Sequence, residues 1–303
     1  NQCLSSAENI FALAKTSHVG QLLTTAPYGY YPETEWRDDM ELGAIELYYA
    51  TAQGDLPSGL KHTDPMYYLK QASHWANAYI HGPNDGSDSL NLYDVSGLAH
   101  YELYNAIIQA GNPGNLEVTL NDLINDLHKQ LKNGTQQATH DPFGLGVPYG
   151  GPDATPHALG YTLEANFYDE MTSTSTYTTF GLTERNWVLG TNAWGSSFIV
   201  GDGTTFPDCM QHQVANLIGS LNGQPPIVLG ATVDGPNSLS IFQGLGIPSG
   251  ARKCPPNGGD PFKVFTGKGG RYFDNVTAWP STEPADDYTA LSILVFAQQV
   301  TGK

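Results

Sequence analysis

The sequence predicts an all-α fold, and two features of the chain lead to this prediction. Eight stretches repeat apolar residues at the three- and four-residue spacing of an amphipathic helix. Residues 193–282 hold 15 of the 34 glycines and 9 of the 20 prolines, which indicates a long region of loops. Helices whose loops gather at one end suit a toroid of six helical hairpins, an (α/α)6 toroid. Such a toroid needs twelve helices, so we expect about four helices to be missing from this chain.

Local signals place the helices along the chain. Asp64 is a candidate cap followed by Pro65 at the first helical position, which is typical of a helix start. The pair Asn133-Gly134 is typical of a helix end. The stretches expected to be helical are residues 3–14, 42–49, 65–80, 95–107, 120–133, 157–171, 177–190 and 284–300.

No polar linker divides the chain, so we interpret residues 1–303 as part of one domain. Its regions are helical hairpins over 1–192, a loop-rich region over 193–282 and a final helix over 283–303. A long loop region inside a compact protein usually carries function.

The charge balance limits the classes of partner. The chain has 30 Asp and Glu against 13 Lys and Arg, a formal net charge of −17. Such a surface repels nucleic acid phosphates and anionic lipid. We expect no membrane span, because no window offers about 18 consecutive apolar residues. Neutral ligands that pack on aromatic rings remain, and sugars are of this kind.

The termini and cysteines favour a secreted protein or a piece of one. The chain starts at Asn1 with neither Met nor a signal peptide, which indicates processing or a fragment. Cys209 and Cys254 are candidates for a disulfide, which would leave Cys3 to pair with a thiol outside the chain. The alternative is three buried free thiols.

Two Asn-x-Thr triplets, at Asn133 and Asn275, are candidate glycosylation sites.

The stretch before the last helix carries the strongest chemical signal. Glu283 stands before Pro284, and Asp286 and Asp287 follow within one turn. Clustered carboxylates raise the pKa of at least one of them, and a protonated carboxyl is what cleavage of a glycosidic bond requires. The alternative is an acidic first turn that complements the helix dipole.

Four motifs in order resemble glycoside hydrolase family 9, the cellulase family with an (α/α)6 toroid. The Gly-rich loop of that family is matched by Leu189, Gly190, Asn192, Gly195, Ser197, Phe198, Gly201 and Gly203. Its terminal signature is matched by Glu283, Ala285, Asp287, Tyr288 and Ala290, with Thr282 in place of Asn. Residues 233–237 resemble its Gly-Gly-Pro-Asn turn, and residues 36–51 resemble its acidic helix.

The resemblance implies an inverting endo-β-1,4-glucanase in which Glu283 is the general acid. Tyr288 would line the cleft, and Asp287 would orient nearby groups. The Asp-Ala-Gly-Asp motif that supplies the family's catalytic base does not occur in this sequence. We therefore expect the base on an N-terminal fragment of the same precursor, held to this chain and linked through Cys3 if that thiol pairs.

One departure from the family affects substrate contacts. The family usually has Pro-His-His-Arg after the Gly-rich loop, and this chain has Gln211, His212 and Gln213 at the last three positions. Glutamine hydrogen-bonds a sugar but carries no charge, so this branch has a different substrate or has lost activity.

Trp36, Trp194 and Trp279 are candidate platforms for a pyranose ring, with core tryptophan as the alternative.

Metal chemistry is weakly indicated. The acidic loop over residues 85–94 suits Ca²⁺, and the competing interpretation is a loop in which Asp94 caps the next helix. No cofactor is expected for catalysis.

The sequence thus supports a secreted hydrolase acting on a β-glucan or a related oligosaccharide. The rival hypotheses are a glycan-binding relative without hydrolysis and a storage or defence protein on the same fold.

Overall fold

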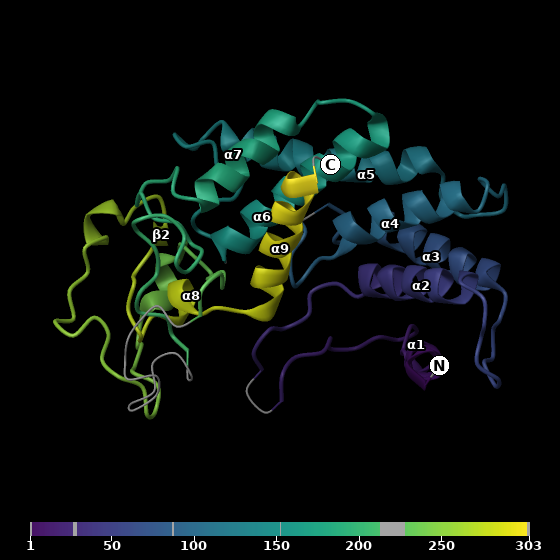
Figure 1. Ribbon diagram of the computed structural model, residues 1–303, viewed down its shortest axis with the longest axis horizontal. Coiled ribbons are helices and arrows are strands. Elements are labelled where there is room, and N and C mark those ends of the chain that lie inside the picture. Colours follow the sequence, from purple (N-terminus) through teal and green to yellow (C-terminus); the bar gives the residue numbers. More distant parts are fainter. Residues whose placement is uncertain (1, 27–28, 87, 152, 213–227, 302–303) are drawn as a thin grey trace. The chain divides into compact units, whose positions relative to one another are not determined.

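The computed structural model of the chain describes residues 2–26, 29–86, 88–151, 153–212 and 228–301 (Figure 1). Two compact units divide these residues: unit 1 contains Asn1–Gln130 and Phe167–Thr174, and unit 2 contains Leu131–Asn166 and Ser175–Lys303. The helices are α1 Gln2–Leu13, α2 Arg37–Ala52, α3 Pro65–Ile80, α4 Ser96–Gln109, α5 Leu120–Ala138, α6 Ala154–Thr172, α7 Thr178–Val188, α8 Trp279–Thr282 and α9 Asp286–Thr301.

The predicted all-α class is confirmed. Each of the eight expected helical stretches is helical, and the described residues add only the one-turn helix α8. The described strands are β1 Asn237–Ser238 and β2 Gly270–Arg271, which form one short antiparallel ladder. Two 3-10 turns, η2 Leu239–Phe242 and η3 Lys263–Phe265, lie in the loop region. Within the described ranges, no helix combines the length and apolar character needed to cross a bilayer.

The core of unit 1 is built from α2, α3 and α4, which pack against one another (Figure 1). Helix α3 starts as the sequence predicts, because the Asp64 carboxylate accepts the Met66 N–H at 3.0 Å and Pro65 occupies the first turn. Small and branched side chains at the helix contacts are fully buried, among them Ala44, Ile45, Leu69, Ala72, Ala99 and Leu103.

Helix α5 begins with a reciprocal cap. The Thr119 hydroxyl accepts the Asp122 N–H, and the Asp122 carboxylate accepts the Thr119 N–H at 2.8 Å. The predicted end at Asn133-Gly134 is wrong, since α5 continues to Ala138. Gly134 serves packing: a Cβ there would lie 2.7 Å from Cζ of Tyr161. The missing side chain therefore makes room for an aromatic ring.

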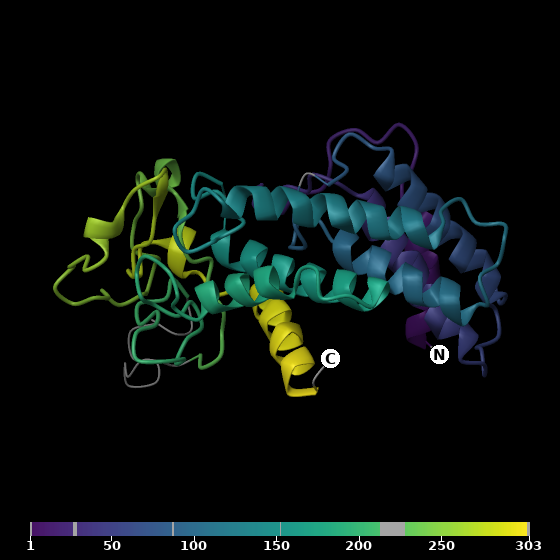
Figure 2. The same cartoon turned by 90° about the horizontal axis from the view of Figure 1, so that it is seen from above.

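Unit 2 contains the loop-rich region, the long irregular stretch drawn from green to yellow in Figure 2. Side chains fix its turns through the backbone: the Asn192 amide donates to the carbonyls of Trp187 and Ser196 at 2.7 and 2.8 Å. The predicted disulfide is present, with Cys209 and Cys254 joined and their Cα atoms 5.2 Å apart. The alternative of three free thiols is wrong, and Cys3 is a free, exposed cysteine.

Three remote stretches of unit 2 run side by side as isolated β-bridges. Ile199 pairs with Thr232, and Val233 pairs with Pro284, both antiparallel. These bridges bring the Gly-rich loop and the turn at residues 233–237 to the link between α8 and α9. The three motifs that the sequence analysis singled out there are therefore neighbours.

Candidate active site

Glu283 lies between two helices rather than inside one. It follows α8 with an extended backbone, φ −73° and ψ 121°, while α9 begins at Asp286. The acidic first turn of α9 consists of Asp286 and Asp287 alone. The acidic first turn that the sequence offered as an alternative is therefore present in Asp286 and Asp287, and Glu283 precedes it.

Main-chain contacts hold Glu283 against the turn at residues 233–237. Its N–H donates to Oδ2 of Asp234 at 3.1 Å, and the Asp234 N–H donates to the Glu283 carbonyl at 3.3 Å. Glu283 is half-buried, whereas Asp234 is buried. The glutamate therefore sits on a fixed backbone and still reaches solvent.

Behind this backbone lies a buried polar cluster that the sequence analysis did not identify. The Tyr288 hydroxyl lies 3.1 Å from Oδ1 of Asp234 and 3.3 Å from Oδ2 of Asp153. The Asn237 amide donates to Oδ1 of Asp153 at 2.5 Å. One signal in the sequence pointed to it: Asp234 stands where the resembling family has glycine.

Burial sets the charge of this cluster. It raises the pKa of Asp234 well above its usual range, and the negative charges of Asp153 and Glu283 add to the rise. Burial also raises the pKa of Asp153, partly offset by His157 and by the hydrogen bond from Asn237. The pKa of Tyr288 is raised by burial and by both carboxyls, so its hydroxyl stays protonated.

Tyr288, the candidate cleft residue, is more deeply buried than Asp287, the candidate orienting residue. Tyr288 is 4% exposed, and its hydroxyl faces the buried carboxyls. Asp287 is half-buried, and burial raises its pKa against the lowering effect of nearby N–H groups at the start of α9. Its Oδ2 atom is buried and has no hydrogen-bond partner among the described residues.

The structure brings the glutamine segment next to the glutamate. The Gln211 N–H donates to the Thr282 carbonyl at 3.0 Å, so Gln211 and His212 lie beside the backbone that leads into Glu283. Both are partly exposed. Gln213 lies outside the described residues.

The tryptophans divide between core and surface. Trp194 is 7% exposed and packs edge-on against Trp187 and Tyr272, which leaves no open ring face for a sugar. Trp279 is 45% exposed at the start of α8. Trp36 belongs to unit 1 and lines a hollow there.

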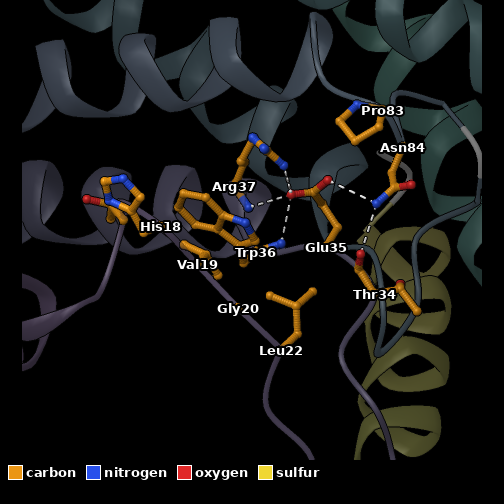
Figure 3. A pocket seen from close by; sticks show the side chains of 11 residues that line it. His18, Val19, Gly20, Leu22, Thr34, Glu35, Trp36, Arg37, Pro83 and Asn84 are labelled. Carbon is orange, nitrogen blue, oxygen red and sulfur yellow. Dashed lines mark hydrogen bonds and ion pairs between the residues drawn. The ribbon is translucent and has the colours of Figure 1, made fainter.

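The hollow in unit 1 has a volume of about 410 Å³ (Figure 3). The buried Glu35 carboxylate at its wall accepts Arg37 Nη1 at 2.7 Å, the Trp36 N–H at 2.9 Å and the Asn84 amide at 3.3 Å. Although burial alone raises the pKa of Glu35, the N–H groups of Trp36 and Arg37 and the Arg37 guanidinium lower it overall. The hollow is lined by Thr16, His18, Val19, Gly20, Leu22, Thr34, Glu35, Trp36, Arg37, Pro83 and Asn84.

The acidic loop at residues 85–94 uses its carboxylates within the protein. Asp85 pairs with the Lys129 ammonium. Asp94 accepts the Ser96 N–H at 2.9 Å, at the start of α4, and the Tyr79 hydroxyl at 2.7 Å. Over the part of the chain that the structure describes, no group of three potential ligands is arranged to hold a metal ion.

The two candidate glycosylation sites differ in access. Asn133 is exposed on α5. Asn275 is buried, and its side-chain oxygen accepts the N–H and the hydroxyl of Thr277.

Several solved structures share the fold of this chain. They include the cellulase Cel9M of C. cellulolyticum in complex with cellobiose, with 18% identity, a TM-score of 0.64 and coverage of 99% of this chain and 58% of that chain. The catalytic domain of Clostridium thermocellum CelT has 18% identity, a TM-score of 0.58 and coverage of 89% and 49%. AaCel9A in complex with cellobiose-like isofagomine has 14% identity, a TM-score of 0.64 and coverage of 94% and 47%. Among curated protein sequences, none matches the chain significantly.

The family follows from the sequence itself. The profile of glycosyl hydrolase family 9 matches residues 1–296, so the chain belongs to that family. It spans about half the length of the solved relatives. Catalysis in this family requires no cofactor.

Proposed function

We propose that this chain is part of a glycoside hydrolase that cleaves a β-1,4-glucan with inversion, with Glu283 as the general acid. The observation that carries the proposal is the position of Glu283. It matches the family's terminal signature, its backbone N–H is hydrogen-bonded to Asp234, and the residue is only half-buried. The cellobiose and isofagomine bound in two of the relatives support a glucan as the substrate class.

In this mechanism Glu283 protonates the glycosidic oxygen while a second carboxylate removes a proton from the attacking water. Inverting enzymes keep these two carboxyls roughly 6.5–9.5 Å apart to leave space for the water. Asp153 and Asp234 are buried, so they do not supply that base. We propose that the base comes from an N-terminal segment that this chain does not contain.

Two tryptophans, the partly buried Trp36 and the exposed Trp279, are the proposed sugar contacts. Trp36 lines the hollow of unit 1, where the Arg37 guanidinium lies 4.9 Å from the centre of its ring. Trp279 offers a partly exposed indole beside α8. An indole face excludes water from the apolar face of a pyranose. Trp194 is left out of the proposal because its ring is in the core.

A second candidate function is glycan binding without hydrolysis. It is favoured by Gln211 and Gln213, which replace the charged pair that the resembling family uses to hold substrate and acid. A neutral amide beside Glu283 retains hydrogen bonding and loses the electrostatic contribution.

We also propose secretion, supported by the disulfide between Cys209 and Cys254, since such bonds persist in oxidising compartments. A calcium ion at residues 85–94 forms no part of the proposal, because Asp85 and Asp94 already have protein partners.

The test compares the chain alone with the chain combined with an N-terminal segment that carries the Asp-Ala-Gly-Asp motif. Hydrolysis of a soluble β-1,4-glucan is expected only in the combination. Glu283→Gln should then lower kcat by roughly 10²- to 10⁴-fold, the usual contribution of a general acid, with little change in the Kd for cello-oligosaccharides.

The matched control is Asp286→Asn, which neutralises an exposed carboxylate three positions away and should leave kcat within about twofold. Unchanged turnover in Glu283→Gln would refute its role as the acid. Tight binding without hydrolysis in the wild-type combination would instead support the glycan-binding function.

A further inference from the structure

The buried cluster behind Glu283 is assembled from three distant parts of unit 2. Asp153 precedes α6, Asp234 lies in the turn before β1, and Tyr288 is in the first turn of α9. They are 8%, 3% and 4% exposed. Groups this buried do not touch a polymer substrate, so a role for them acts through a neighbour.

When both carboxyls are ionised, the cluster has one hydrogen too few to give each of its oxygen–oxygen contacts a hydrogen bond. Asn237 donates to Oδ1 of Asp153, and the Glu283 N–H donates to Oδ2 of Asp234. The remaining oxygens, Oδ2 of Asp153 and Oδ1 of Asp234, both contact the Tyr288 hydroxyl, which has one hydrogen. An acidic proton on one carboxyl completes the set, because the tyrosine oxygen then accepts one bond and donates the other.

The surroundings disfavour two negative charges. Asp287 faces the cluster from α9, and Glu283 faces it from the link before α9. Among the described residues, the basic group that acts on Asp153 is His157 on α6, whose Nδ1–H donates to the Asp153 carbonyl at 2.7 Å. Two buried carboxyls that share a site and face further carboxylates keep one proton between them.

We infer that Asp153 and Asp234 share one proton through Tyr288 and that Asp234 is a positioning residue for Glu283, holding its backbone and keeping a single negative charge beside its carboxyl. This inference rests on the proposed function only in assigning Glu283 as the acid. A constant negative neighbour disfavours loss of the Glu283 proton, and a general acid must hold that proton until the substrate accepts it.

The turn around Asp234 is shaped for this contact. Gly235 has φ +74°, and a Cβ at this position would lie 2.1 Å from the Thr155 hydroxyl oxygen. The Thr155 N–H donates to the Asp234 carbonyl at 3.0 Å. The start of α6 therefore locks the backbone that aims the Asp234 carboxyl at both Tyr288 and the Glu283 N–H.

Proton sharing makes an unusual prediction about charge. Asp153→Asn and Asp234→Asn each remove one carboxyl, but the proton that was shared is released at the same time. Each single variant therefore keeps one negative charge, and only the double variant loses it. If both carboxyls were ionised, every single substitution would remove a charge.

The experiment follows the Glu283 titration by carbon NMR of the chain labelled at glutamate side-chain carboxyls. The Glu283 signal is assigned by its loss in Glu283→Gln. In each single variant, the pH at the midpoint of the Glu283 titration should stay nearly unchanged. In the double variant, this midpoint should fall by on the order of one pH unit, because one close negative charge is lost. Asp286→Asn is the control, because its exposed charge is screened.

Several outcomes would overturn the inference. A lower midpoint in both single variants shows two charges and no shared proton. An unchanged midpoint in the double variant shows that the cluster does not act on Glu283. If the substituted chains do not fold, carbon NMR of aspartate-labelled wild-type chain counts the protonated carboxyls instead. One protonated carboxyl among Asp153 and Asp234 at pH 7 supports the shared proton, and two ionised carboxyls overturn it.

The titration needs no turnover, so its result is separate from the hydrolysis assay. If the Glu283 titration midpoint changes only in the double variant but the assembled protein does not hydrolyse glucan, the proposed function is refuted and the shared proton is supported. Hydrolysis that depends on Glu283, together with a Glu283 titration midpoint that falls in both single variants, would support the proposed function and refute the shared proton.

Discussion

Unit 1 contains a fully buried histidine that lies between two acids. His100 Nδ1 lies 2.8 Å from Oε1 of Glu41, and Nε2 lies 3.2 Å from Oδ2 of Asp126. His100 and Glu41 are fully buried. Because both ring nitrogens face carboxyl oxygens, the imidazole is held in its charged form, with a proton on each nitrogen.

Burial opposes that charge, but the two acids outweigh it and raise the pKa of His100 well above its usual range. Burial raises the pKa of Glu41 to about 7. Burial alone would also raise the pKa of Asp126, but the hydrogen bond and charge of His100 lower it to about 2. The three residues therefore titrate together rather than as independent groups.

His100→Gln should destabilise the chain by about 3–5 kcal/mol at pH 6, because it removes the cation that keeps the buried Asp126 ionised and the hydrogen-bond partner of the buried Glu41. The folded pKa of His100 is above its unfolded value of about 6.5, so its stabilisation is complete below that pH and declines as pH rises toward the folded pKa. Urea unfolding from pH 6 to 9 should show the gap between wild type and variant narrowing. His74→Gln is the control, since its pair with Glu117 is exposed.

A constant gap across that pH range would show that the pKa of His100 is the same in the folded and the unfolded chain, and a widening gap would show that His100 is neutral in the folded chain. A change of less than about 0.5 kcal/mol at pH 6, similar to that expected for His74→Gln, would show that the two acids do not depend on it.

At the scale of elements, α5 and α2 each carry a glycine inside the helix, and the two glycines have different surroundings. A Cβ on Gly134 of α5 would lie 2.7 Å from Tyr161 Cζ and 3.0 Å from Phe180 Cζ. A Cβ on Gly43 of α2 would lie 3.5 Å from Phe11, an ordinary contact distance. Neither glycine is required by a left-handed backbone.

Gly134→Ala should therefore destabilise the chain by about 1–3 kcal/mol through overpacking, despite the better helix propensity of alanine. Gly43→Ala is the matched control and should stabilise by about 0.5–1 kcal/mol. Thermal and urea unfolding measure both. A stabilised Gly134→Ala chain would mean that the aromatic rings move aside at little cost.

At the scale of the whole chain, local signals were sufficient for the helices and insufficient for the site. Apolar periodicity and the Asp64 cap predicted the elements because both depend on residues within one or two turns. Glu283 was found because it belongs to a contiguous motif. Asp153 and Asp234 escaped prediction because they meet only after Val233 pairs with Pro284 and α9 carries Tyr288 between them.

The same limit explains one wrong expectation and one open one. Gly134 was interpreted as a helix end because the signal for a C-cap and the signal for close packing are both a glycine. Trp194 was a candidate sugar platform with core tryptophan as the alternative, and its loop folds inward and places the ring among Trp187 and Tyr272, as the alternative has it. Burial of a loop is a tertiary property that a single sequence does not display.

The acidic composition makes a last prediction about the whole chain. With 30 acidic and 13 basic residues, folding brings like charges together, so the folded chain repels itself at neutral pH. Raising salt from 0.01 to 0.15 M shortens the screening length from about 30 to about 8 Å. The free energy of unfolding at pH 7 should rise by roughly 1 kcal/mol, the size of a few surface charge interactions in water.

Sodium chloride and potassium chloride should act alike in urea unfolding. At a pH near the sequence pI of about 4.6 the effect should largely disappear, because the net charge is close to zero. A salt effect that persists there would point to specific ion binding instead of general repulsion.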